Sequence, residues 1–238
     1  MKTISLMYHD IVLENDKSSG FQNDSAFQYK VLKGNFEKQV SALKEDDVEF
    51  TFDDGGESFI TSAAPILEKY GKKGVFFIAT DFIGTPGFLN EEQVRELDAR
   101  GHVVGSHSCS HPHNMTDLTE SEIEKEWSES IRKLENILGH KVEVASIPNG
   151  YKNKNILKYA EKAGIKKLWT SDLVDSRFGK MELKGRYVIH KDTFLEDTIA
   201  IAQSNVMRLK LKCRWAILSV VKGILGNSYD NVKKKFVK

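Results

Sequence analysis

The chain contains 238 residues, 40% of them hydrophobic and 29% charged, which is typical of one globular domain and excludes a disordered chain. Its 35 basic and 34 acidic residues leave a formal net charge of +1, so the molecule as a whole lacks the charge excess of a polyanion-binding protein. The two cysteines, Cys109 and Cys213, are far apart in the sequence, which favours a reducing compartment over a disulfide-stabilised fold.

The N-terminal segment does not read as a targeting sequence. Its short apolar stretch is interrupted by Tyr8-His9-Asp10, so the continuous apolar run of a signal peptide is missing. No stretch of the chain reaches the roughly 20 apolar residues that span a bilayer. We therefore expect a cytoplasmic protein.

Short apolar runs alternate along the chain with amphipathic segments. The runs predict buried strands at residues 4–7, 48–52, 74–79, 102–105, 142–147, 167–170 and 187–189. The amphipathic segments predict helices at residues 65–70, 91–100, 119–138 and 155–163, the third opening with the capping box Thr119-Glu-Ser-Glu122. Residues 172–184 are expected to form a polar loop. This alternation predicts a parallel sheet with crossover helices, either a barrel or an open doubly wound sheet.

Two groups of polar residues follow predicted strands and have the chemistry of a hydrolytic metal centre. Asp53 and Asp54 come directly after the run 48–52, and His107 and His111 lie four residues apart after another run. One carboxylate and two imidazoles suit Zn²⁺ with open coordination positions, and the spare carboxylate could act as a base. Each group alone could be a polar turn. Together, at the carboxyl end of a parallel sheet, they favour the metal site.

These residues also carry a resemblance. Thr51-Phe52-Asp53-Asp54-Gly55 and His107-Ser108-x-x-His111 resemble the first two motifs of the polysaccharide deacetylase family, the NodB-homology or carbohydrate esterase family 4 fold. The similarity runs over about residues 4–203. It implies a distorted, incomplete (β/α) barrel that removes acetyl groups from N-acetylated sugars. By the resemblance, Asp53 is the general base, while Asp54, His107 and His111 bind a divalent metal, Zn²⁺ or another transition metal.

The third motif of the family is altered in this chain. Ser146-Ile-Pro-Asn149-Gly150 has serine where the family has arginine, and the resemblance makes the backbone N–H of Asn149 the oxyanion donor. The missing arginine would hold Asp53 in place and keep it ionised, so its loss should raise the pKa of Asp53. Arg177 and Arg186 are possible substitutes. We favour Arg186 because it enters the strand that leads to His190, although it could equally be a surface charge.

The resemblance assigns two further residues, and the residue types suggest three more. His190 corresponds to the general acid that protonates the leaving amine, and Asp172 to the acid that orients this histidine. Tyr151, Trp169 and Arg186 are placed in the substrate pocket, where the two aromatic rings could stack on a sugar. For Tyr151 and Trp169, packing in the core is an equal alternative.

The C-terminal segment has a different charge from the rest of the chain. Residues 205–238 contain nine Lys or Arg and one acid, Asp230, a net charge of +8, so residues 1–204 carry −7. We therefore divide the chain into a catalytic domain, 1–204, and a basic amphipathic helical extension, 205–238. Its apolar stripe consists of Val206, Leu209, Cys213, Ala216, Ile217, Val220 and Ile224. The helix could pack on the barrel, lie on an anionic bilayer or form a dimer contact, whereas its apolar residues disfavour nucleic acid.

Together these features predict a metal-dependent deacetylase of N-acetylated sugars that acts in making surface polysaccharide. Lipid-linked saccharides would suit a helix that contacts the inner face of a membrane. Two alternatives remain open. Ser146 favours a carbohydrate-binding protein that keeps its metal but has lost turnover, and the site chemistry would also suit hydrolysis of a non-sugar amide.

Overall fold

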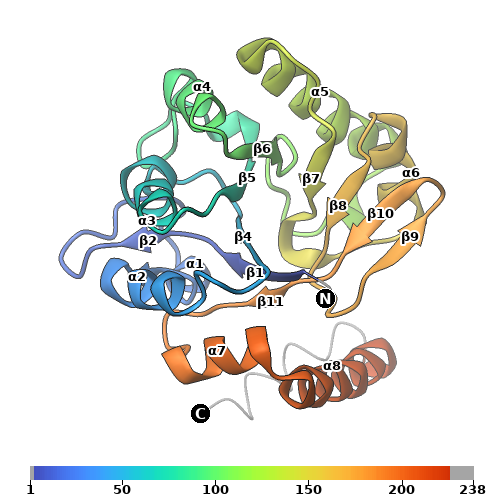
Figure 1. Ribbon diagram of the computed structural model, residues 1–238. Coiled ribbons are helices and arrows are strands. Elements are labelled where there is room, and N and C mark those ends of the chain that lie inside the picture. The colour runs from blue at the N-terminus through green and yellow to red at the C-terminus, as the bar shows by residue number, and fades with distance from the viewer. Residues whose placement is uncertain (1–2, 226–238) are drawn as a thin grey trace.

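The computed structural model describes residues 3–225, which form a half-barrel covered by helices (Figure 1). Its main sheet consists of β1 (Ile4–Tyr8), β4 (Val48–Phe52), β5 (Gly74–Ile78), β6 (Val103–Ser106), β7 (Val144–Ser146), β8 (Lys167–Trp169), β9 (Ser176–Phe178), β10 (Met181–Lys184) and β11 (Tyr187–Val188). A second, two-stranded sheet pairs β2 (Ile11–Val12) with β3 (Val31–Leu32).

The strand order in the main sheet is β11-β1-β4-β5-β6-β7-β8-β10-β9. All pairs are parallel except β9 with β10, and the sheet ends at β11 and β9, so the curl is not closed by a strand pair. This curled mixed sheet confirms the predicted incomplete barrel. Because its strands are parallel, the side chains that follow β1, β4, β6 and β7 meet at one rim.

The helices are α1 (Asp24–Phe27), α2 (Lys33–Ala42), α3 (Ala64–Lys69), α4 (Glu91–Ala99), α5 (Glu120–Leu138), α6 (Lys154–Lys162), α7 (Leu195–Gln203) and α8 (Asn205–Leu225). Four of them confirm the helices predicted between residues 65 and 163 to within two residues. The capping box at Thr119 is present, since its hydroxyl accepts from the N–H of Glu122 and the Glu122 side chain accepts from the N–H of Thr119. Gly139 ends α5 with φ 76°, a left-handed conformation that suits glycine.

The alternating side chains of strand β4 place its aromatic residues in the core and its polar residues on the side of the site. Successive side chains of a strand point to opposite faces. Phe50 and Phe52 point to the helix layer, where the Phe52 ring stacks on Phe76 at 4.7 Å and on Tyr8 at 5.6 Å. Thr51 and Asp53 are buried on the opposite, inner face of the half-barrel. The strand therefore anchors itself in an aromatic core and presents Asp53 to the inside.

The prediction of a polar loop at residues 172–184 is wrong. This segment contains the hairpin of β9 and β10, in which Met181 and Leu183 of β10 are buried. Strand β10 pairs with β8 and extends the sheet, which supplies the hydrogen bonds that a loop would leave unmade.

The C-terminal helix is confirmed as α8, which begins directly after Ser204, the residue that ends α7. Met207 and Leu211 pack against the main core. Residues 226–238 of the predicted extension, and the side chains of Val220 and Ile224, lie outside the described residues. The division into two domains at residue 204 stays a prediction. No helix in the described part of the chain has the length and apolar character needed to cross a membrane.

A partly buried ion-pair network fixes α3 to the end of α4. Arg100 donates to Glu68 from Nε (3.0 Å) and Nη2 (2.7 Å), and Nε2 of His102 lies 3.0 Å from the same carboxylate. Hydrogen bonds from Arg100 hold the pKa of Glu68 down at about 2, below the ordinary 4.5. A carboxyl whose pKa is lowered on folding stabilises the fold above its unfolded pKa, and this stabilisation is lost as the pH falls.

Glu68→Gln is therefore expected to reduce the free energy of unfolding at pH 7 by about 2 kcal/mol, the size of a charge-assisted hydrogen bond. The difference from the wild type should shrink as the pH falls from 4.5 towards 2 and Glu68 of the wild type is protonated. Urea unfolding at pH 7, 5 and 3 measures this. A difference that stays constant over this range would contradict the role given to Glu68.

Candidate metal centre

Three side chains converge at the rim of the half-barrel. Asp54 follows β4, and His107 and His111 lie in the loop after β6. Nε2 of His107 is 3.4 Å and Nε2 of His111 is 3.2 Å from Oδ1 of Asp54. One potential ligand atom from each of the three residues lies within 4.8 Å of the other two. The structure thus brings together the residues that the sequence predicts as metal ligands.

The backbone at this site is held in conformations that are rare for residues other than glycine. Among residues 3–225, four non-glycine residues have positive φ: Asp54 (90°), Ser108 (63°), His111 (52°) and Asn149 (55°). All four belong to the three loops that form the site. Because such conformations are unfavourable and persist only where the surroundings impose them, their concentration here indicates a functional site.

The ring of His107 is oriented by β7. Its Nδ1 lies 3.1 Å from the carbonyl oxygen and 2.6 Å from the hydroxyl oxygen of Ser146. A proton on Nδ1 that is donated to Ser146 leaves the lone pair of Nε2 directed at Asp54. Metal-binding histidines are usually oriented in this way by a second hydrogen bond. Ser146, where the resemblance expects arginine, thus has a contact of its own with a predicted ligand.

The loop between the two histidines is held by Glu126 of α5. The N–H groups of Cys109 and Ser110 donate to its Oε2 at 2.9 and 3.0 Å, and the hydroxyl of Ser110 donates to Oε1 at 2.6 Å. One carboxylate therefore holds the loop that carries both His107 and His111. Sequence analysis missed Glu126, because its spacing from the loop carries no local signal.

Glu126→Ala is expected to weaken divalent-metal binding by about 10- to 100-fold, as is typical when a group that orients metal ligands is removed. Isothermal titration with Zn²⁺ measures the change. Glu129→Ala, three residues further along α5, is the matched control and should bind as the wild type does. Equal affinity in both variants would show that the carboxylate of Glu126 does not organise the site.

Asp53 lies beside the three predicted ligands but has a different partner. Its Oδ1 accepts from Nη1 of Arg186 at 2.7 Å and its Oδ2 accepts from Nη2 at 2.8 Å, a bidentate pair with both side chains buried. Oδ2 lies 4.0 Å from Nε2 of His107. Arg186 immediately precedes β11, which lies on the other side of β4 in the strand order from β7, the strand that carries Ser146.

The surroundings of Asp53 keep it ionised. Burial raises the pKa of Asp53, but the charge of Arg186, with His107 and the hydrogen bonds from Arg186, outweighs burial and leaves this pKa below its ordinary value. The rise in pKa that the sequence suggests from the missing arginine is therefore wrong. Arg186 is fully buried, which excludes the surface-charge alternative, and its placement among substrate-contacting residues is wrong too.

A cavity opens at the site. It is lined by Met7, His9, Phe21, Asn23, Ser25, Ala26, Tyr29, Asp53, Asp54, His107, His111, Ile147, Asn149, Ser171 and Val188. Tyr29 lies between two histidine rings, with its centroid 4.5 Å from that of His9 and 4.9 Å from that of His190, both in tilted arrangements. Sequence analysis gave no chemistry to His9, yet its buried Nδ1 has no hydrogen-bond partner among the described residues.

The other predicted site residues differ in their placement. Asn149 lies in the turn Pro148–Gly150 and lines the cavity. His190 is exposed and follows β11, and its general-acid role stays a prediction. The carboxylate of Asp172 pairs with Lys152, so an orienting role toward His190 also stays a prediction. Tyr151 is half-buried, with its ring 6.3 Å from that of His113, and is not among the lining residues.

The sugar-stacking role suggested for Trp169 is wrong. Its side chain is 3% exposed, packs on Phe77 with ring centroids 5.2 Å apart, and donates from Nε1 to Glu49 at 2.9 Å. Trp169 is thus a packing residue, the alternative that the sequence left open.

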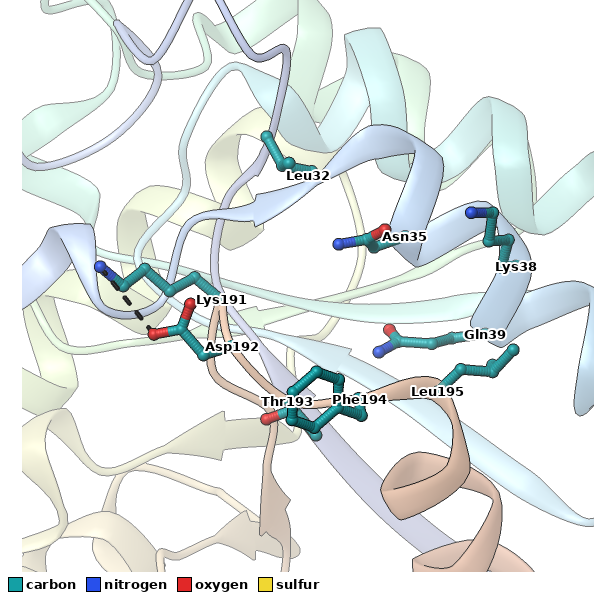
Figure 2. Close-up of a pocket in the computed structure, with 9 residues that line it drawn as sticks. All are labelled: Leu32, Asn35, Lys38, Gln39, Lys191, Asp192, Thr193, Phe194 and Leu195. Atoms are coloured by element: carbon teal, nitrogen blue, oxygen red, sulfur yellow. Dashed lines mark ion pairs between the residues drawn. The ribbon is translucent and has the colours of Figure 1, made fainter.

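A second cavity begins one residue after His190. Figure 2 shows its lining residues, Leu32, Asn35, Lys38, Gln39, Lys191, Asp192, Thr193, Phe194 and Leu195, which come from β3, α2 and the segment that leads into α7. Phe194 is 71% exposed, and polar side chains of Asn35, Lys38 and Thr193 accompany it.

The residues at the rim fit a divalent cation. Oδ1 of Asp54 is buried and has no hydrogen-bond partner of good geometry among the described residues, although two imidazole nitrogens face it. Burial raises the pKa of Asp54, but these two imidazoles outweigh burial and hold this pKa well below its ordinary value. One carboxylate oxygen and two imidazole nitrogens are a donor set for Zn²⁺ and similar metals. The identity of the metal stays a prediction.

Comparison with known proteins agrees with this site. The family model for polysaccharide deacetylases matches residues 41–168. YxkH of Bacillus subtilis (strain 168) is 34% identical over 120 residues, which are 50% of this chain and 43% of YxkH. The peptidoglycan-N-acetylmuramic acid deacetylase PdaA of the same organism is 26% identical over 144 residues, 59% of this chain and 53% of PdaA. The chain thus spans about half the length of these relatives.

The fold has known counterparts as well. The structure of the Streptococcus pyogenes deacetylase PplD in complex with acetate superposes with a TM-score of 0.70 at 20% identity, covering 85% of this chain and 99% of that chain. Since the family model covers more than half of the sequence, the chain belongs to the polysaccharide deacetylase family.

Proposed function

We propose that this protein is a metal-dependent deacetylase that hydrolyses the N-acetyl groups of saccharides. One observation supports this most. Asp53 is an acid outside the predicted ligand set, and Arg186 keeps it ionised. Its Oδ2 lies 4.0 Å from Nε2 of His107, a predicted ligand. A hydrolytic centre needs both a metal site and a separate base, and this arrangement supports the proposal that the protein has both.

The residues divide the reaction between them. When bound, a divalent cation supplies Lewis acidity, which lowers the pKa of a water molecule and polarises a carbonyl. Asp53 accepts the proton of the attacking water, and Arg186 positions this carboxylate. The backbone N–H of Asn149, at the edge of the cavity, donates to the oxyanion that forms on the acetyl carbonyl. His190 donates a proton to the leaving amine.

A binding-only protein is the weaker alternative. It was suggested by Ser146, which replaces the arginine expected beside the base. Because Arg186 supplies a guanidinium to the same carboxylate, the serine no longer argues for lost turnover. Relatives such as PdaA, whose name specifies a peptidoglycan deacetylase, support a saccharide over a non-sugar amide. The cytoplasmic location stays a prediction.

Acetate release from N-acetylated saccharides tests the proposal. Protein loaded with Zn²⁺ should release acetate from oligomers of N-acetylglucosamine or from peptidoglycan fragments, and a chelator should abolish the release. If the loaded protein binds these saccharides without releasing acetate, the binding alternative is correct. If it hydrolyses only simple amides, the saccharide part of the proposal fails.

The second cavity is proposed to hold a further sugar of the substrate chain. An exposed aromatic ring among amide and hydroxyl groups suits the apolar face and hydroxyls of a sugar. Phe194→Ala is therefore expected to raise KM for oligosaccharides about fivefold, the effect of an apolar contact of about 1 kcal/mol, with kcat unchanged. Steady-state kinetics on a tetramer and a dimer measure this. An equal effect on both lengths would argue against a separate subsite for a further sugar.

A further inference from the structure

The outward face of α8 is apolar. Val206, Leu209 and Ile217 are 78%, 63% and 65% exposed, and Cys213 and Ala216 between them are exposed as well. Figure 1 shows α8 on the outside of the molecule, next to α7 and apart from α3 to α6. These five residues recur at helical spacing and form the described part of the stripe that the sequence predicts. The predicted stripe is therefore the side of α8 that residues 3–225 leave uncovered.

The contacts of α8 with the protein use another side of the helix. Met207 and Leu211 pack against the main core, and Nη1 of Arg208 donates to the carbonyls of Ile201 (2.8 Å) and Ala202 (2.7 Å) at the end of α7. Packing on the barrel thus explains the inner residues of α8. It leaves the outward apolar face unexplained.

Positive charge accompanies this face. Residues 205–225 contain five Lys or Arg and no acid. Lys210 and Arg214 follow Leu209 and Cys213 in the sequence and are exposed as well. Long basic side chains of this kind can keep their charge in water while the stem covers an apolar surface. Residues 1–204 carry a net charge of −7, so α8 is a basic, apolar surface on an acidic body.

We infer that α8 docks on the surface of an anionic lipid bilayer. Val206, Leu209 and Ile217 enter the boundary between headgroups and acyl chains, and Lys210 and Arg214 contact the lipid phosphates. A second copy of the chain would bring the same cations against each other with no acid in α8 to balance them. A nucleic acid would leave the apolar stripe in water. The acidic body is repelled by the same surface, which orients the protein with α8 against the lipid.

Vesicle flotation of the full chain tests this inference without any substrate. The wild type should float with phosphatidylcholine vesicles that contain 30% phosphatidylglycerol and remain unbound with pure phosphatidylcholine. The triple variant Val206→Ser/Leu209→Ser/Ile217→Ser should bind at least about tenfold more weakly, because each side chain loses its apolar burial. Lys210→Glu/Arg214→Glu should also lower the affinity for these vesicles at least about tenfold, because basic residues near an anionic surface are attracted to it and acidic ones are repelled.

Lys154→Glu/Lys180→Glu is the matched control, since it changes two exposed lysines outside α8 by the same charge. It should bind as the wild type does, and circular dichroism melts should show that all variants fold. The inference would be overturned if the wild-type protein does not bind anionic vesicles, or if the variants of α8 float as well as the wild type does. It would also be overturned by a wild type that is dimeric by light scattering and becomes monomeric in the triple variant, since the apolar face would then be a contact between copies.

Discussion

Replacing Arg186 with methionine is expected to lower kcat for acetate release by at least about 100-fold while the protein still binds its divalent metal. The two hydrogen bonds from Arg186 hold the carboxylate of Asp53, and its charge opposes the effect of burial on the pKa of Asp53. Without it the pKa of Asp53 rises, so the base is protonated over more of the pH range. The acid limb of the pH–rate profile should therefore move to higher pH.

Arg177→Met is the matched control. Arg177 is the other arginine that could replace the missing one by sequence, and its side chain is 68% exposed and paired with Glu182 at 3.5 Å. This variant should keep the rate and pH profile of the wild type. If both arginine variants behave alike, the guanidinium of Arg186 does not serve Asp53.

The stability of Arg186 variants distinguishes the contribution of the Asp53–Arg186 pair to folding from its contribution to catalysis. Breaking a buried pair typically costs about 3–5 kcal/mol, because the remaining charge is left without a partner. Arg186→Met should therefore lower the midpoint of urea unfolding, and the double variant Arg186→Met/Asp53→Asn should recover much of the loss. The double variant should nevertheless remain inactive. Recovered activity would contradict the role of Asp53 as base.

Asp53→Asn is expected to reduce kcat by about 100- to 10,000-fold, the usual contribution of a general base. The amide keeps the size of the side chain but cannot accept the proton. The ligand atoms of Asp54, His107 and His111 are untouched, so metal content should stay at the wild-type level.

Asp54→Asn is the natural comparison, since it alters the neighbouring acid and should lose metal as well as activity. Metal analysis together with acetate release distinguishes the two. Asp53→Asn with activity within a few fold of the wild type would reject its assignment, as would Asp53→Asn protein that no longer binds metal.

The sequence predicted the parts of the site that are encoded locally. Asp53 and Asp54 follow an apolar run, His107 and His111 lie four residues apart in one loop, and parallel strands bring both pairs to one rim. The capping box at Thr119 depends on neighbouring residues alone and was equally readable. In each case the physical cause lies within a few residues of the signal.

Contacts between distant segments could only be guessed or were missed. Arg186 reaches Asp53 across 133 residues, and Glu126 meets the His107–His111 loop through the crossing of α5, which no local pattern records. The sequence could not decide between packing and sugar stacking for Trp169, because β8 has only three residues, too few for alternation to reveal which face is buried. Strand β10 was different. Apolar and polar residues alternate in Met181-Glu-Leu183-Lys, which is typical of a strand, but the polar residues around this segment obscured the pattern.

We propose that Asp54, His107 and His111 bind one divalent cation, with Asp53 beside it. Anomalous scattering from crystals grown with Zn²⁺ would locate this cation. One peak should lie about 2.0–2.2 Å from a carboxylate oxygen of Asp54 and from Nε2 of both histidines, with Asp53 bound to Arg186 and not to the metal. A peak elsewhere, or a cation bound by Asp53 in place of Asp54, would contradict the account.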